Sequence, residues 1–210
     1  MHPLIKKAKT ALNDLLSAVK KLPDKISEVT GYVATRVPLS RASGPNEVTL
    51  DVPGYAQLDT YCCGVVAGVM VVKYFRPRAS FSQFHDRVDP KPEWGASTAK
   101  IARALRESGV RVKVRSGLAF ADLRGAIDAG SPVIVSVQNP SAETGHWVVV
   151  YGYGRNPNRV FVATNGLPLF TRNAIPLQKF ARIWRPRGNG LICDYPKRLS
   201  RRACRAVKHT

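Results

Sequence analysis

The sequence predicts an α+β protein, in which helices come first and an antiparallel β-sheet follows. Segments with helical spacing and helix caps dominate the chain up to residue 128. Short β-branched runs bounded by glycine or proline dominate residues 132–163. With 210 residues, 44% of them hydrophobic and 22% charged, the chain is long and apolar enough to bury a core.

Residues 1–45 are predicted to be an extension that precedes the main domain, which we place at residues 46–190. Apolar side chains spaced three and four apart over residues 3–30 predict an amphipathic helix with lysines on its flanks, bent or broken near Pro23. The proline- and glycine-containing residues 31–48 are typical of a linker. Three roles for the helix stay open: docking on the domain, lying on a membrane surface, or acting as an inhibitory or targeting segment.

The main domain contains one segment whose secondary-structure type the sequence pattern leaves ambiguous. Gly64 to Phe75 is rich in valine, which favours a strand, but its length is typical of a buried helix. Ser97 and Gly109 are placed as the N-cap and C-terminal glycine of a later helix. The predicted elements are, in order, a strand at 48–53, helices at 64–75, 80–88 and 97–108, a strand at 110–114, a helix at 119–128, strands at 132–137, 147–151 and 160–163, and a helix at 177–184.

Two adjacent cysteines, Cys62 and Cys63, stand where a polar run beginning at Gln57 opens into the apolar segment. The first turn of a helix carries unpaired N–H groups and a partial positive charge, which favours a thiolate. A cysteine in that position can therefore react near neutral pH. The alternative is that both cysteines are small core residues.

A histidine and an asparagine lie at the ends of two predicted neighbouring strands. His146 precedes the apolar run Trp147–Tyr151, and Asn165 follows the next strand. A thiol, an imidazole that accepts its proton, and an amide that orients the imidazole are the parts of a thiol nucleophile. Each of the two residues alone has a simpler reading, since a histidine at a strand end is often structural and Asn-Gly is first of all a turn.

In these motifs the chain resembles papain-fold cysteine peptidases, and among them most closely the bacteriocin-processing, double-glycine-leader peptidases. The resemblance rests on Gln57-x5-Cys63-Gly64 before an apolar helix, on Gly-His146-Trp-Val-Val, and on a polar residue after the next strand, and it covers roughly residues 48–190. It implies a papain-like fold in which the nucleophile helix packs on an antiparallel sheet.

The resemblance also implies roles for four residues. Cys63, chosen over Cys62 by its spacing from Gln57, would be the nucleophile, and its backbone N–H would form the oxyanion hole together with the Gln57 amide. His146 would be the general base and then the general acid, and Asn165 would orient it. The activity implied is hydrolysis of a peptide or other amide bond through an acyl-enzyme thioester, without cofactor or metal. The third position departs from the leader peptidases, which usually have an acidic residue followed by proline, and is closer to papain.

The chain is strongly basic, with 33 Lys and Arg against 14 Asp and Glu and a net charge of +19. Residues 155–187 contain basic but no acidic side chains, and residues 191–210 are predicted to form a basic tail. Such charge attracts polyanions without sequence specificity. The alternative function is therefore an inactive papain-like scaffold that binds nucleic acid or anionic membrane.

The sequence contains no apolar run of the roughly 18 residues that span a bilayer, and no signal peptide is recognisable. Four cysteines in a chain of this length do not form a disulfide framework, although Cys193 and Cys204 could pair in an oxidising compartment. These features predict a cytoplasmic protein, and export by a non-classical route stays open. No oligomeric state is predicted.

Overall fold

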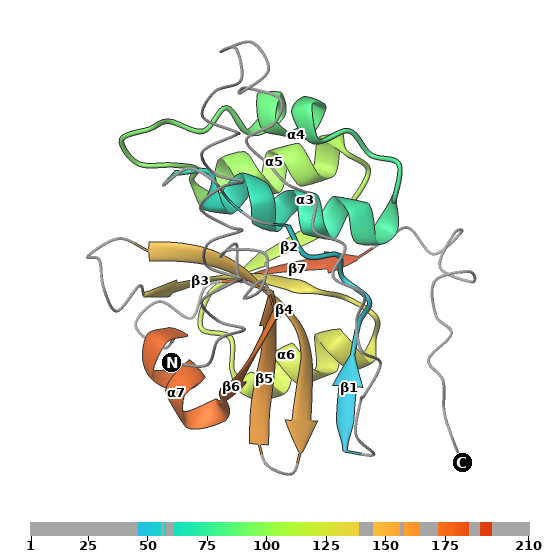
Figure 1. Cartoon of the computed structure of the whole chain (residues 1–210), viewed down its shortest axis with the longest axis vertical. Helices are drawn as coiled ribbons and strands as arrows, with labels where there is room; N and C mark the ends of the chain where they lie inside the picture. Colours follow the sequence, from blue (N-terminus) through green and yellow to red (C-terminus); the bar gives the residue numbers. More distant parts are fainter. Residues whose placement is uncertain are drawn as a thin grey trace, which may run out of the picture.

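The computed structural model describes residues 46–55, 57, 61–138, 145–155, 158–163, 172–184 and 190–194 (Figure 1). The helix predicted over residues 3–30 lies outside the described residues. Within them, mixed helix and antiparallel sheet confirm the predicted α+β class. No helix in this part of the chain is both long and apolar enough to cross a membrane.

One antiparallel sheet forms the centre of the described structure. Its strands follow the order β2-β7-β3-β4-β5-β6, and β1 pairs with β4. Every pairing between them is antiparallel. The strands are β1 (Glu47–Thr49), β2 (Arg111–Arg115), β3 (Val133–Gln138), β4 (Gly145–Arg155), β5 (Asn158–Ala163), β6 (Arg172–Pro176) and β7 (Gly190–Asp194).

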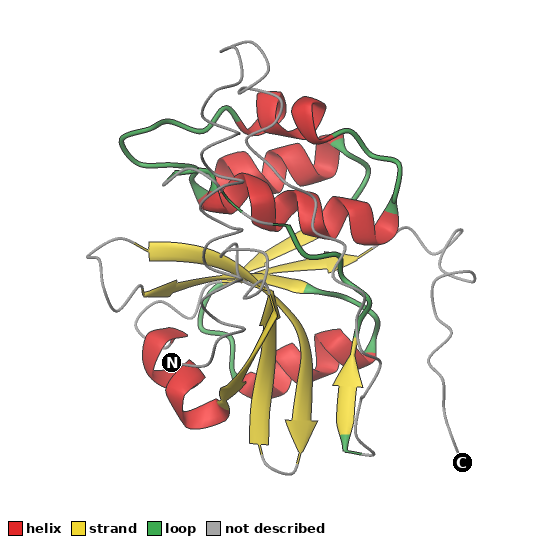
Figure 2. Ribbon diagram, viewed as in Figure 1, coloured by secondary structure: helices red, strands yellow, loops and turns green. Residues whose placement is uncertain are grey.

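In the part of the chain that the structure describes, helices cover both faces of the sheet (Figure 2). On one face lie α3 (Cys63–Phe75), α4 (Phe81–Val88) and α5 (Thr98–Glu107), and on the other α6 (Phe120–Asp128) and α7 (Leu177–Trp184). The valine-rich segment that begins at Gly64 is thus a helix, as its length predicted. It is buried from Gly64 to Val72, which explains why it has no polar face.

Strand β4 is buried on both sides because each face of the sheet has its own core. Trp147 and Val149 pack in the core beneath α3 and α5, whereas Val148 and Val150 pack in the core that includes α6 and α7. This alternation follows from the period of two in a strand. It explains why β4 reads as an almost continuous apolar run.

The predicted N-cap of α5 is confirmed, and α4 also begins at a serine N-cap. Ser80 Oγ accepts a hydrogen bond from the N–H of Gln83 at 3.4 Å, and Ser97 Oγ accepts one from the N–H of Lys100 at 3.3 Å. After α5, Gly109 has a φ of +81°, a conformation that glycine adopts without strain.

Strands β6 and β7 are not among the predicted elements. β7 pairs with both β2 and β3, so residues 191–194, which the sequence analysis assigned to the basic tail, lie inside the sheet. Its apolar run, Leu191 to Cys193, is too short to be recognised without its neighbours. β1 is shorter than the predicted 48–53 strand, and β4 is longer than 147–151, with an irregularity in its pairing between Val150 and Gly152.

Candidate active site

The two adjacent cysteines differ in exposure. Cys62, the N-cap of α3, is fully buried in the core, and Cys63, the first residue of the helix, is only partly buried. The helix starts at this point, with the N–H of Val66 donating to the carbonyl oxygen of Cys62 at 3.0 Å. The Cys63 side chain is therefore partly accessible to solvent and lies at the positive end of the helix dipole, whereas the Cys62 side chain is buried in the core.

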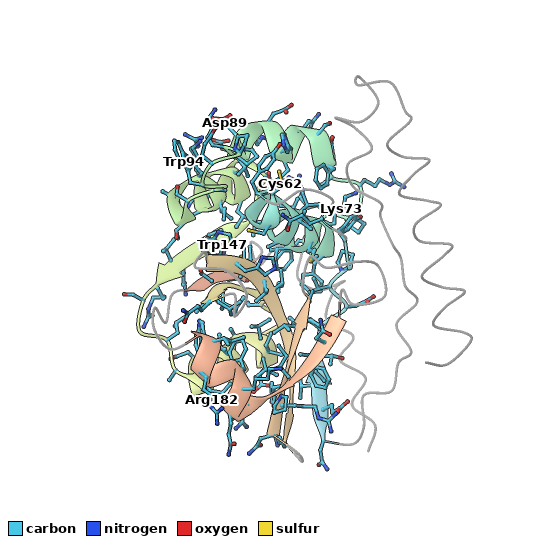
Figure 3. All side chains as sticks on the ribbon, turned by 60° about the vertical axis from the view of Figure 1, so that its left-hand side comes forward. Cys62, Lys73, Asp89, Trp94, Trp147 and Arg182 are labelled. Carbon is cyan, nitrogen blue, oxygen red and sulfur yellow. The ribbon has the colours of Figure 1, made fainter. Side chains whose placement is uncertain are left out.

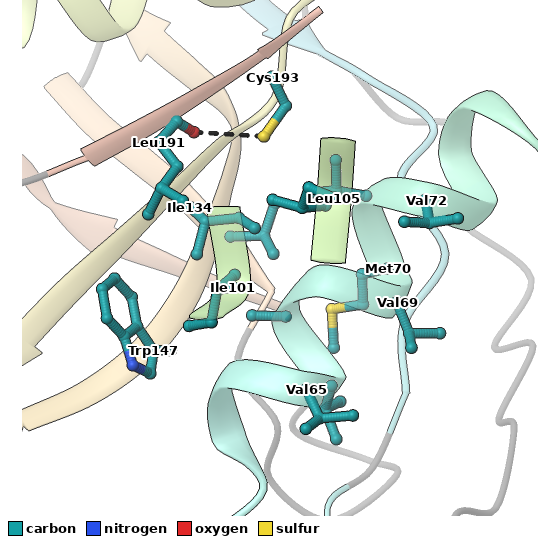
Figure 4. Close-up of a cluster of buried hydrophobic side chains, with 14 of the residues drawn as sticks. Val65, Val69, Met70, Val72, Ile101, Leu105, Ile134, Trp147, Leu191 and Cys193 are labelled. Atoms are coloured by element: carbon teal, nitrogen blue, oxygen red, sulfur yellow. Dashed lines mark hydrogen bonds between the residues drawn. The ribbon is translucent and has the colours of Figure 1, made fainter. Parts of the chain in front are cut away.

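A glycine, Gly64, allows the start of α3 to pack closely against β4 and α5. A Cβ atom at Gly64 would lie 3.1 Å from Trp147 Cδ1 and 2.7 Å from Ile101 Cδ1, so only glycine lets the helix come this close. Trp147 is held in place by its own indole N–H, which donates to the carbonyl oxygen of Ala96 at 3.1 Å. Figure 4 shows Trp147 and Ile101 beside the first turns of α3.

This contact brings together the two motifs that the sequence analysis singled out. Cys63 immediately precedes Gly64, and His146 immediately precedes Trp147. His146 lies near the beginning of β4, opposite Val137 of β3. The first residue of the helix and the first residues of the strand are therefore neighbours in space although they are distant in the sequence.

Burial lowers the pKa of His146 below its ordinary value of 6.5, because a buried site disfavours the charged imidazolium. The imidazole is therefore neutral at neutral pH, and a neutral imidazole is the form that accepts a proton.

Gln57 and Asn165 are the other two predicted site residues. Gln57 lies within the described residues, and its side chain is partly buried. Asn165 lies outside the described residues, so its role next to His146 stays a prediction.

Cys193 provides an internal contrast to Cys63. It is fully buried in β7, and its thiol donates to the carbonyl oxygen of Leu191 at 3.4 Å (Figure 4). Burial raises the pKa of this thiol, which makes it unreactive. In the part of the chain that the structure describes, no group of three or more His, Cys, Asp or Glu side chains is arranged to hold a metal ion.

The turn between α4 and α5 also borders the start of α3, which the sequence analysis did not anticipate. A Cβ at Gly95 would lie 2.8 Å from the carbonyl oxygen of Tyr61, two residues before Cys63. Pro90, Pro92 and Gly95 mark this loop in the sequence, but no local pattern shows that it packs against the residues around Cys63.

The mixed helices and antiparallel sheet form a papain-like cysteine peptidase fold. The chain belongs to the Peptidase_C39 like family, whose model matches residues 49–192. This confirms the family resemblance seen in the sequence motifs. No curated protein matches the chain.

Solved structures of low identity share the fold. A double glycine motif protease from an AMS/PCAT transporter, solved in complex with the leader peptide, has a TM-score of 0.57 at 19% identity and covers 71% of this chain and 95% of its own. The peptidase domain of Streptococcus ComA, a bifunctional ABC transporter of a quorum sensing pathway, has a TM-score of 0.54 at 21% identity, with 71% and 98% covered. A protein described as a C39-like peptidase from Bacillus anthracis has a TM-score of 0.57 at 15% identity, also with 71% and 98% covered.

Proposed function

We propose that this chain is a cysteine peptidase that hydrolyses an amide bond of a peptide or protein, with Cys63 as nucleophile and His146 as general base. The observation that carries the proposal is the packing of Gly64 on Trp147, because each is the immediate neighbour of one proposed catalytic residue. Membership of a peptidase family supports the same reaction class. A peptide substrate agrees with the leader peptide bound by one protein of similar fold.

In the first half of the reaction, the Cys63 thiol gives its proton to the neutral imidazole of His146, and the sulfur attacks the carbonyl carbon of the scissile bond. The new oxyanion accepts hydrogen bonds from the backbone N–H of Cys63 and from the side-chain amide of Gln57, as the family resemblance implies. The C–N bond then breaks while His146 returns the proton to the leaving amine. The product of this step is a thioester between the acyl group and Cys63.

In the second half, His146 takes a proton from water as the water oxygen attacks the thioester carbon. The C–S bond breaks, the carboxylic acid leaves, and the proton returns to the sulfur, which restores the starting state. Asn165 would accept a hydrogen bond from the other ring nitrogen of His146 and so fix its orientation. Each oxyanion donor of this kind contributes about 10²–10³ in rate, so Gln57→Ala should lower turnover nearly as severely as loss of the imidazole.

The test is alkylation by iodoacetamide from about pH 4 to about pH 9, read out at each cysteine by mass spectrometry. We expect Cys63 to react well below the ordinary thiol pKa of about 8.5 and far faster than Cys62 or Cys193. His146→Ala should remove this advantage. His85→Ala is the matched control, because His85 is a partly exposed histidine on α4.

If Cys63 reacts no faster than the buried cysteines, or if His146→Ala and His85→Ala behave alike, the peptidase proposal fails. A peptidase that has lost activity but kept its fold would give the same result. The basic surface would then be the next feature to test.

A further inference from the structure

The turn between α4 and α5 exposes a large aromatic side chain. The chain has three tryptophans; the side chain of Trp94 is 78% exposed, whereas Trp147 and Trp184 are 9% and 4% exposed. Exposure of one apolar side chain is common on protein surfaces. Two further features suggest a function for the exposed Trp94: the interactions that hold its turn in place, and the position of that turn beside the start of α3.

The turn that carries Trp94 is held by several interactions. The N–H of Lys91 donates to the carbonyl oxygen of Gly95 at 2.9 Å, and the N–H of Gly95 donates to the carbonyl oxygen of Lys91 at 2.6 Å. The carboxylate of Asp89 binds Lys91 Nζ at 2.9 Å and Lys100 Nζ at 3.1 Å. These bonds tie the turn to the end of α4 and to α5. A side chain on such a support loses little backbone freedom when it binds a partner.

The turn packs against residues on both sides of the proposed nucleophile. Gly95 lies against the carbonyl of Tyr61, which precedes Cys62, and the next residue, Ala96, has its Cβ 3.3 Å from the position of a Cβ at Gly64. Trp94 is therefore separated by only one residue, Gly95, from Ala96, which lies against the residue that follows Cys63. Figure 3 shows Trp94 in the same helical layer as Cys62.

On the basis of the proposed function, we infer that Trp94 determines specificity by contacting an apolar side chain of the substrate a few residues from the scissile bond. An extended peptide advances about 3.3 Å per residue, and the turn packs against Tyr61 and Gly64 on either side of Cys63, so a few residues of a substrate bound at Cys63 are long enough to reach it. Lys91 and Lys100 are already engaged by Asp89, and the acidic residue Glu93 immediately precedes Trp94 in the sequence, so the turn does not favour an acidic side chain. Tryptophan is, with tyrosine and arginine, enriched among the residues that dominate the binding energy of protein–protein interfaces.

The first experiment is a cleavage screen with a positional-scanning library of quenched fluorogenic peptides. We expect wild type to prefer a bulky apolar side chain at one position near the cleaved bond. Trp94→Ala should lower kcat/KM for the preferred peptides by about tenfold and remove the preference at that position alone, while Trp94→Phe should keep most of it. Val114→Ala is the matched control, since Val114 is the other large apolar side chain exposed in the described residues.

The second experiment measures binding without turnover. In the Cys63→Ala variant, acrylamide quenches mainly Trp94, because the other two tryptophans are buried. The best-cleaved library peptide should lower this quenching, and Trp94→Phe should abolish the change.

Iodoacetamide alkylation of Cys63 separates failure of this inference from failure of the proposed function, because so small a reagent needs no contact with Trp94. If peptides are cleaved and Cys63 is reactive, but Trp94→Ala leaves the cleavage profile unchanged or peptide binding leaves the quenching unchanged, the role of Trp94 is overturned and the peptidase assignment stands. If no library peptide is cleaved, or if Cys63 shows no elevated reactivity, both are overturned.

Discussion

Replacing Gly64 by alanine perturbs the contacts that join the start of α3 to β4 and to α5. The added Cβ would lie 2.7 Å from Ile101 Cδ1 and 3.1 Å from Trp147 Cδ1, and the first distance is about 1 Å inside the usual carbon–carbon contact of roughly 3.5–4.0 Å. Ile101 and Trp147 are both buried, so neither can move into solvent. Overpacking of this kind costs about 1–3 kcal/mol, and the better helix propensity of alanine offsets at most about 1 kcal/mol. We expect a net loss of about 1–2 kcal/mol.

Two further variants identify the cause of that loss. Gly125 lies on α6 with nothing within 4 Å of the position of its Cβ, so Gly125→Ala should gain up to about 1 kcal/mol from propensity alone. Ile101→Val deletes Cδ1, the atom nearest to the new Cβ, at a cost of about 0.5–1.5 kcal/mol. The double variant of Gly64→Ala and Ile101→Val should lose less stability than the sum of the two single changes.

Urea unfolding followed by circular dichroism measures these differences, and alkylation of Cys63 reports whether the nucleophile is still placed against β4. We expect Gly64→Ala to slow alkylation of Cys63 in addition to lowering the urea midpoint, because the helix start must move away from Trp147. If Gly64→Ala stabilises the protein as Gly125→Ala does, the close packing of the start of α3 on β4 and α5 is refuted. If Ile101→Val does not reduce the cost of Gly64→Ala, the contact of Gly64 with α5 is refuted.

Other predictions concern protons, thiols, a buried hydrogen bond and charge. Because burial lowers the pKa of His146 below 6.5 in the folded state, the unfolded chain binds this proton more tightly than the folded chain does. The free energy of unfolding is therefore not reduced by His146 above pH 6.5, and it falls as the pH drops from 6.5 through the folded pKa. His146→Gln should flatten this slope in urea titrations at several pH values, and an unchanged slope would contradict the burial. Cys193, fully buried, should react with a thiol reagent at about pH 8 only at the rate of unfolding; rapid labelling in native buffer would be evidence against its position in β7. Tyr153→Phe removes a hydrogen bond of 2.6 Å from the Tyr153 hydroxyl to Asp128, and it should lower the free energy of unfolding by about 1–2 kcal/mol. Thermal unfolding measures this loss, and an unchanged stability would show that the bond is not formed. The net charge of +19 should give heparin binding that weakens steeply with salt; retention that does not depend on salt would exclude this electrostatic origin.

Much of the local structure could be predicted because its causes are local. The caps Ser80 and Ser97 lie next to the helices that they start, so the sequence shows both partners of the hydrogen bond within four residues. The type of the segment beginning at Gly64 followed from its length, although its valines alone favour a strand. β7 could not be predicted in this way, since its short apolar run becomes a strand only through pairing with β2 and β3.

The sequence by itself determined the order of the helices and strands and the motifs around Cys63 and His146, because spacing, caps and the periods of helix and strand are properties of neighbouring residues. It also pointed to the family that the comparisons then confirmed. Only the tertiary structure decided that Cys62 is buried while Cys63 is partly exposed, that Gly64 packs on Trp147, and that the turn bearing Trp94 borders the same helix start. The physical reason is that burial and close packing depend on residues that are far apart in the chain and meet only when the sheet and its helices assemble.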